Sequence, residues 1–349
     1  MSVDKTAIQA MQEYREARNV LVPLFAAVEL LGLLRGLASS GLFELTQTPT
    51  SEEQVSALLK MDSQRAMELC NTLFAHGVFV KEDGKFRLAE RWRILTAADA
   101  VFAFQNVLDG AFARSTALYF AVQSDADFWS LAPAERVANA KFGSIDPLSP
   151  HSPQIIAAMI ETNLPELHAA LVNGGNYLEL GCGVGGGLLS TVRAYANIMA
   201  VGVELAPDLI AVATQRAHSL GVNDRVTFWQ GDAQNFTTQR EFDYVWWSQF
   251  FFPPATRSNV IKVALRALKP GGYLIAPVMG NPSLAYERLE SDMGQMFMRN
   301  RVLFGAWGIP AIGIQELQQE LEAEGFRDVN TFSTPMTINP IVVGRKPST

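Results

Sequence analysis

The sequence has little cysteine, little histidine and no excess of positive charge. Its 349 residues include 2 cysteines, 4 histidines and 28 basic against 35 acidic residues. Cys70 and Cys182 are too far apart in the chain for a metal-binding motif or a disulfide framework, so we expect no metal and a cytoplasmic location. The net charge of -7 argues against nucleic acid as a partner, because an acidic surface repels a phosphate backbone.

The sequence also lacks a long uninterrupted apolar run. Its most apolar stretch, VLVPLFAAVELLGLL at 20–34, contains Pro23 and Glu29. We predict that this stretch is too short to span a bilayer, and we expect no membrane partner. The charged residues scattered through the first twenty positions are not the pattern of a signal peptide.

The chain is long enough for more than one domain, and it has enough apolar side chains to form their cores, since 48% of its residues are hydrophobic. Residues 1–95 have the pattern of a winged helix. A helix is predicted over 20–38, and further helices begin near Ser51 and Asp62. Two short strands then flank an Asp-Gly turn. The apolar residues of these helices recur at helical spacing, which indicates inward-facing positions.

The third helix of this segment, DSQRAMELCNTLFAHG at 62–77, would be the one that reads DNA in a winged helix. It carries Asp62, Arg65 and Glu68 but no lysine, whereas a reading helix needs basic and amide side chains. The segment is therefore predicted to be a packing and dimerisation module, and we expect a homodimer.

Residues 96–170 are predicted to be a mainly helical linker that contributes to a substrate pocket. Its large aromatic residues are expected to be mostly core, with a minority lining the pocket: Phe102, Phe104, Phe112, Tyr119 and Trp129. Residues 171–349 then form a separate domain.

The most informative stretch of this last domain is NYLELGCGVGGG at 176–187. A buried strand leads into Gly181, Gly183 and Gly185, and an apolar helix follows. Glycines let a ligand approach backbone N–H groups closely. The next predicted strand ends in Glu204, where a carboxylate can accept hydrogen bonds from the two hydroxyls of a ribose.

The glycine spacing alone would also suit a dinucleotide-binding enzyme, so the later elements matter. Further strands are predicted at 226–230, ending before Asp232, and at 242–247. Another follows a Pro-Gly-Gly turn at 270–272, and a closing hairpin is predicted near the C-terminus. This order resembles the class I methyltransferases, which bind S-adenosylmethionine (SAM). With the winged helix and helical linker, nearly the whole chain resembles the small-molecule O-methyltransferases. The resemblance implies an α/β fold: a Rossmann-like, doubly wound, SAM-binding sheet with a mainly α N-terminal winged-helix domain.

The resemblance also implies a set of SAM-binding residues. The methionine end would lie near Glu179 and the glycines, the ribose at Glu204 and the adenine near Leu205, Asp232 and Ala233. Ser248 would lie near the carboxylate or the sulfonium. Read without the resemblance, Glu204 could be a surface carboxylate and Asp232 a turn cap.

The family keeps a histidine base after its fourth strand, and here that position is Phe252, within YVWWSQFFFPP at 244–254. The catalytic group is therefore unknown. We predict that no side chain near the transferred methyl titrates between pH 6 and 9. His151, Glu287, Glu290 and Asp292 are weaker candidates for a base. Positioning alone can supply most of the acceleration when the nucleophile needs no deprotonation.

The predicted function is SAM-dependent O- or N-methylation of a small, largely apolar or aromatic metabolite, of the kind made in secondary metabolism. The alternatives are C-methylation of an electron-rich carbon or isoprenoid alkene, with or without cyclisation, and a SAM-fold protein that no longer transfers methyl. The expected substrate contacts are aromatic and methionine side chains after the fourth and fifth strands, with plain packing as the competing interpretation: Phe251, Phe252, Met293, Met296, Phe297 and Trp307.

Overall fold

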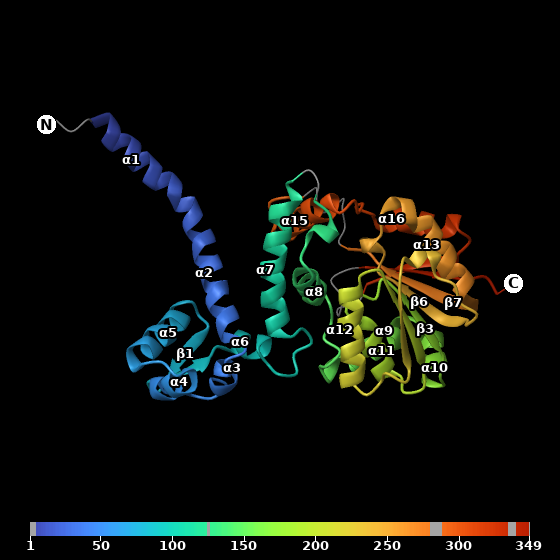
Figure 1. Cartoon of the computed structure of the whole chain (residues 1–349), viewed down its shortest axis with the longest axis horizontal. Helices are drawn as coiled ribbons and strands as arrows, with labels where there is room; N and C mark the ends of the chain where they lie inside the picture. The colour runs from blue at the N-terminus through green and yellow to red at the C-terminus, as the bar shows by residue number, and fades with distance from the viewer. Residues whose placement is uncertain (1–4, 124–125, 280–287, 334–339, 349) are drawn as a thin grey trace. The chain divides into compact units, whose positions relative to one another are not determined.

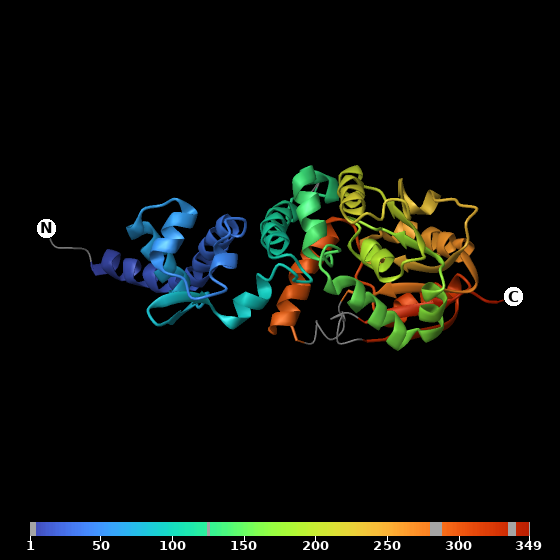
Figure 2. The same ribbon diagram turned by 90° about the horizontal axis from the view of Figure 1, so that it is seen from below.

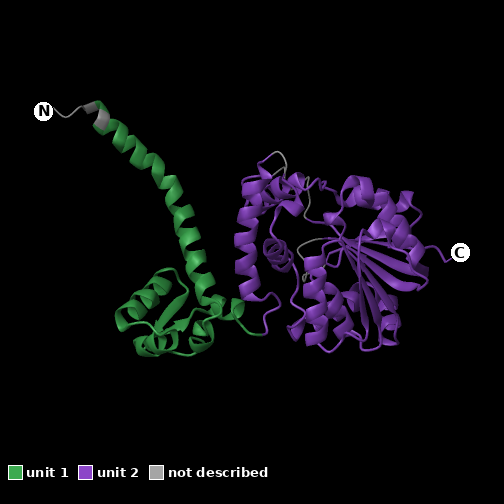
Figure 3. Cartoon of the chain, in the orientation of Figure 1, with its two compact units in different colours: residues 1–98 green, residues 99–349 purple. Residues whose placement is uncertain are grey.

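The computed structural model describes residues 5–123, 126–279, 288–333 and 340–348, and Figures 1 and 2 show it from two directions. The chain divides into two compact units, Met1–Ala98 and Asp99–Thr349 (Figure 3). The helical segment predicted as a linker therefore lies in the same unit as the sheet.

The first unit has the predicted order of helices and hairpin. Its elements are α1 (Lys5–Arg18), the 3-10 helix η1 (Asn19–Leu21), α2 (Val22–Leu37), α3 (Leu42–Leu45), α4 (Glu52–Leu59), α5 (Ser63–Ala75), β1 (Phe79–Glu82), β2 (Lys85–Leu88) and α6 (Glu90–Leu95). Ser51 caps α4 in a capping box with Gln54, and Asp62 caps α5. Asp83 and Gly84 both have positive φ, as a two-residue hairpin turn requires.

The run from α1 to α2 differs from the prediction. Its apolar residues Leu24, Phe25 and Val28 are 60%, 47% and 62% exposed, and only toward the end of α2, at Leu34, does an apolar side chain become buried. By length and composition the helical run Ile8–Leu37 could cross a membrane, because the helix that contains the apolar stretch is longer than the sequence alone indicated. Within the unit the run has too few neighbouring side chains to bury its apolar surface.

The second unit is a seven-stranded sheet with helices on both faces. Its elements are α7 (Phe104–Ala121), η2 (Phe128–Ser130), α8 (Pro133–Phe142), α9 (His151–Asn163), α10 (Pro165–Val172), β3 (Asn176–Leu180), α11 (Gly186–Ala194), β4 (Met199–Glu204), α12 (Pro207–Ser219), β5 (Val226–Gln230), η3 (Ala233–Asn235), β6 (Phe242–Trp247), η4 (Gln249–Phe251), α13 (Pro254–Ala267), β7 (Leu268–Pro277), α15 (Asp292–Ala306), α16 (Ile314–Ala323), β8 (Arg327–Phe332) and β9 (Ile341–Arg345).

The strand order β5-β4-β3-β6-β7-β9-β8 confirms the doubly wound α/β prediction, with β9 antiparallel to its neighbours. The order reverses between β3 and β6, where such sheets bind ligands beyond the carboxyl ends of the strands. Leu180 at the end of β3 pairs with Val203 on one side and Trp247 on the other. The residues that follow these three strands therefore emerge at the same level of the sheet edge.

The expectation that the linker aromatics are mostly core is wrong for Phe102, Tyr119 and Trp129, which are 48%, 66% and 46% exposed. Helix α7 buries small residues instead, because α8 packs closely against it. A Cβ added to Gly110 would lie 2.3 Å from the Cβ of Phe142. Such a close approach leaves no room for large rings on the buried face of α7.

Candidate functional site

The glycine loop between β3 and α11 combines a strained turn with an open backbone. Gly181, Gly183 and Gly185 have φ values of +77°, +53° and +75°, which disfavour other residues. A Cβ on Gly183 would meet nothing within 4 Å, so its backbone is open to a ligand. Gly186 is constrained by packing, because its Cβ would lie 2.5 Å from the carbonyl oxygen of Ile145. The loop after α8 thus covers the start of α11.

Glu204, at the end of β4, fixes this loop from the neighbouring strand. Its Oε2 accepts a hydrogen bond from the Gly183 N–H at 2.9 Å, and its Oε1 accepts from Leu205 and Ala206 at 2.8 and 3.0 Å. Burial raises the pKa of this carboxyl, and the three backbone hydrogen bonds oppose that rise. A carboxylate has about four acceptor sites, so it can still accept from a ligand hydroxyl.

Glu179 lies beneath the glycine loop and is 5% exposed. Tyr177 donates a hydrogen bond to its Oε2, and both its carboxylate oxygens lie 3.6 Å from where a Cβ on Gly187 would be. Burial raises the pKa of Glu179 to about 8; the Tyr177 hydrogen bond opposes this and the Glu204 charge adds to it. Glu179 is therefore a titratable group beneath the loop, and the statement that no side chain near the transferred methyl titrates between pH 6 and 9 stays a prediction.

The other predicted cofactor residues lie around the same sheet edge. Leu205 is 49% exposed, next to Glu204. Asp232 caps η3 by accepting from the Gln234 N–H at 3.1 Å, so the turn-cap interpretation holds, and the adjoining Ala233 is buried. Ser248 follows β6 directly, and its Cβ lies 3.5 Å from the position of a Cβ on Gly181. Their binding roles remain predictions.

An aromatic surface faces the glycine loop from the end of β6. The ring of Phe252 reaches within 3.0 Å of where a Cβ on Gly181 would lie, and it packs edge-on against buried Trp247. Phe251 is half exposed and contacts Phe304 of α15, with ring centroids 6.0 Å apart. Phe304 in turn packs against Trp307. We call Phe250, Phe251, Phe252, Phe304 and Trp307 the aromatic wall.

A buried arginine, which the sequence pattern did not single out, holds the wall in place. Arg257 of α13 donates to the backbone and side-chain oxygens of Gln249, both at 2.9 Å, and pairs with Glu320 of α16. Its guanidinium lies 4.8 Å from the Trp247 ring centroid. Gln249 also donates to the carbonyl of Pro277 at 3.0 Å. The η4 turn is therefore fixed on both sides.

The weaker candidates for a base are exposed where the structure describes them. His151 is half exposed and its Nε2 lies 3.0 Å from Oδ2 of Asp99. Glu290 and Asp292 are exposed, and Glu287 lies outside the described residues. Among the described residues, no hydrogen bond or ion pair connects these candidates to the aromatic wall.

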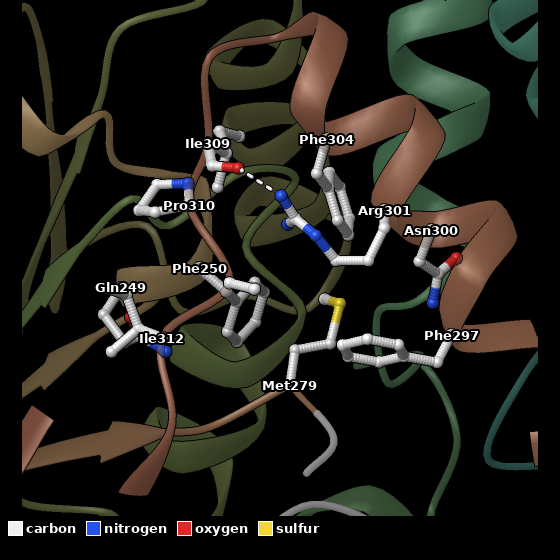
Figure 4. A pocket seen from close by; sticks show the side chains of 11 residues that line it. Gln249, Phe250, Met279, Phe297, Asn300, Arg301, Phe304, Ile309, Pro310 and Ile312 are labelled. Carbon is white, nitrogen blue, oxygen red and sulfur yellow. Dashed lines mark hydrogen bonds between the residues drawn. The ribbon is translucent and has the colours of Figure 1, made fainter. Parts of the chain in front are cut away.

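A small pocket lies between η4 and α15 (Figure 4). Phe250, Met279, Phe297 and Phe304 supply apolar surface, and polar side chains come from Gln249, Asn300 and Arg301. Of the predicted substrate residues on α15, Phe297 lines it. Met293 and Met296 are 56% and 46% exposed and do not. The α15 residues that line the pocket are Phe297, Asn300, Arg301 and Phe304. Met296 therefore lies on the adjoining face of the helix, and Met293 lies one turn before the pocket.

Comparison with known proteins supports the fold. Residues 178–272 match the family described as "Methyltransferase domain". The chain is similar to 27-O-demethylrifamycin SV methyltransferase of Amycolatopsis mediterranei, at 27% identity over 46% of this chain and 59% of that one. It is also similar to erythromycin 3''-O-methyltransferase of Saccharopolyspora erythraea, at 30% identity over 47% and 55%. The chain thus spans a little over half the length of these curated relatives.

Solved structures match over almost the full length. The human N-acetylserotonin methyltransferase in complex with SAM has a TM-score of 0.65 at 15% identity, covering 99% of each chain. An O-methyltransferase family protein from Burkholderia thailandensis has a TM-score of 0.65 at 18% identity, covering 94% of this chain and 97% of that one. These likenesses confirm the class I methyltransferase fold, including the helical N-terminal region.

Proposed function

We propose that this protein, whose residues 178–272 form a methyltransferase domain, transfers a methyl group from SAM to an oxygen of a small, largely apolar or aromatic acceptor. The observation that carries the proposal is the alignment of the open glycine loop, the Glu204 carboxylate and Ser248 at the reversal point of the sheet. Both curated relatives described above are O-methyltransferases by name, so the C-methylation alternative is not favoured.

The residues present fit SAM. The open face of Gly183 suits close approach of the methionine part, and Glu204 has acceptor capacity left for the ribose hydroxyls. Leu205 offers an exposed apolar side chain for the adenine, with Asp232 and Ala233 on the next strand. SAM would supply a methyl group already activated on a sulfonium. Glu179, beneath the loop, would favour its positive charge.

The acceptor side of the proposed site works by positioning. Phe251, Phe252 and Phe304 exclude water and present apolar faces, while Arg257 holds the η4 turn from which two of these rings project. Orienting two reactants in this way lowers the activation barrier, because the entropy of bringing them together is lost on binding. The proposal assigns no side-chain base at Phe252, the position where the family that this chain resembles keeps its histidine, so the acceptor oxygen should already be acidic enough to react as an anion.

Formation of S-adenosylhomocysteine tests this function. Full-length protein is incubated with SAM and a panel of phenols, acidic enols and carboxylic acids, and the product is quantified by mass spectrometry. The expected result is turnover with an acidic oxygen acceptor that is lost in Glu204→Ala. Tight SAM binding without turnover on any acceptor would favour the alternative of a fold that no longer transfers methyl.

We also propose that two copies associate through α1 and α2. The support is the row of exposed apolar side chains on these helices, including Tyr14, Leu24 and Val28, which is large for a surface left in water. Sedimentation of the full chain at micromolar concentration should give a dimer, and Val28→Glu should give monomers. Glu16→Gln, a change at an exposed polar position of α1, is the matched control and should leave the dimer intact. A wild-type monomer would contradict this proposal.

A further inference from the structure

Arg301 is a partly buried cation that has no acidic partner among the described residues. It projects from α15 into the pocket between η4 and α15 (Figure 4). Its Nη2 donates one hydrogen bond, to the carbonyl of Ile309 at 3.1 Å. A guanidinium carries five N–H donors, so most of this group's capacity is unused within the described residues. None of the ion pairs found in the described part of the chain includes Arg301.

The surroundings of Arg301 increase the positive charge. Arg114 of α7 donates to Oδ1 of Asn300 and lies 5.3 Å from the Phe142 ring centroid, again with no carboxylate partner among the described residues. Burial lowers the pKa of Arg114, and the charge of nearby Arg299 lowers it further. Arg114, through its bond to Asn300, thus adds a second positive charge next to the pocket residues.

A purely structural role for Arg301 accounts for only part of this arrangement. Its bond to Ile309 satisfies a carbonyl just beyond the end of α15, as basic side chains near helix ends commonly do. A single hydrogen bond to a carbonyl does not explain why a charged guanidinium lines the same pocket as the rings of Phe250 and Phe304. Gln249 cannot neutralise it, because its amide is already bonded to Arg257 and Pro277. The Nδ2 of Asn300 donates to no partner in the described chain, so a second donor is free at the pocket.

We propose that this pocket binds a carboxylate group of the substrate, with Arg301 and Asn300 as the donors. The inference rests on the proposed methyl transfer and narrows its substrate class to aromatic or apolar carboxylic acids. A planar guanidinium matches a carboxylate in two parallel hydrogen bonds, which sets orientation as well as affinity. Arg301 is a specificity-determining residue in this scheme.

The test is calorimetric binding of benzoate, naphthoate and anthracene carboxylate, each against its uncharged primary amide, with S-adenosylhomocysteine saturating. We expect at least one carboxylate to bind about tenfold or more tighter than its amide, since hydrogen bonds to charged groups contribute about 1.5–3 kcal/mol. Arg301→Gln should abolish the preference, and Arg301→Lys should retain part of it. Arg299→Gln, an exposed arginine of the same helix that does not line the pocket, is the matched control.

Two outcomes would overturn the proposal: no acid in the panel preferred over its amide, or a preference that survives Arg301→Gln. In all three variants the affinity for S-adenosylhomocysteine should equal that of the wild type, which shows that the fold is intact. Failure of the wild-type protein to bind S-adenosylhomocysteine would instead refute the proposed function, so the two failures are distinguishable.

Discussion

At the ends of β3 and β4, the site is made of backbone N–H groups and carboxylates: Glu204 alone accepts three hydrogen bonds, and Glu179 lies buried beneath the loop. At the end of β6, the side chains that face the same loop are aromatic rings, and the polar groups Arg257 and Gln249 lie behind them. A cofactor with fixed charges and hydroxyls needs fixed polar partners. An acceptor that must only be held and shielded from water needs an apolar surface that fits its shape. In the proposed reaction, the first side would bind the cofactor and the second would position the acceptor.

The largest effect should come from breaking the polar support of the aromatic wall. Arg257→Met removes the partner of Glu320 and both bonds to Gln249. We expect the free energy of unfolding, measured with urea, to fall by about 3 kcal/mol. This value is at the low end of the range for breaking a buried ion pair, because Glu320 is 30% exposed. Lys262→Met on the same helix breaks only the exposed pair with Glu324 and should cost under about 1 kcal/mol. Equal losses would show that Arg257 does not anchor the wall.

The cofactor side should respond to loss of one carboxylate. Glu204→Ala removes the acceptor of three N–H groups and the proposed partner of the ribose diol, so SAM affinity should fall at least about tenfold. Titration calorimetry measures this, with circular dichroism to confirm folding. Asp224→Ala, at an exposed position without a partner in the described chain, should bind as the wild type does. Unchanged affinity in Glu204→Ala would remove this residue from the site.

The roles of Glu204 and Arg257 differ in how well the sequence predicts them. The glycines and Glu204 follow predicted strands directly, so their meeting at one sheet edge follows from parallel topology, and the structure brings them together. Arg257 and Arg301 carry no such signal, because their roles depend on which face of a helix meets which neighbour. Tyr119 and Trp129 were misassigned for a similar reason. Composition shows that rings are available to bury but not which side of α7 or η2 faces α8.

Two substitutions of Phe252 with smaller expected effects distinguish a role in fitting the acceptor from a role in deprotonating it. Phe252→Leu keeps an apolar side chain but shortens it, so KM for the acceptor should rise several-fold while the affinity for S-adenosylhomocysteine changes little. Phe252→His should give no increase in kcat, because the account requires no base there. A large gain in kcat from the histidine would show that deprotonation limits the reaction.

The last prediction, release of part of a proton on binding, concerns Glu179, whose raised pKa of about 8 keeps it mainly protonated at neutral pH. Because an unfolded glutamate ionises near its ordinary pKa, the free protein should lose stability as pH rises from about 4.5 to 8. SAM carries positive charge and should favour the carboxylate, so its binding near pH 7 should release part of a proton. Calorimetry in phosphate and Tris buffers measures that release, and Glu179→Gln should abolish it. Equal release in the variant would place the proton elsewhere.

The absence of a side-chain base is tested most directly by the pH dependence of kcat/KM for an acidic acceptor at saturating SAM, where ionisation of the free Glu179 no longer contributes. The account predicts that the wild-type profile follows the acceptor's own ionisation and that His151→Asn leaves it unchanged. A protein pKa of about 6–7, typical of histidine, that disappears in His151→Asn would contradict the account.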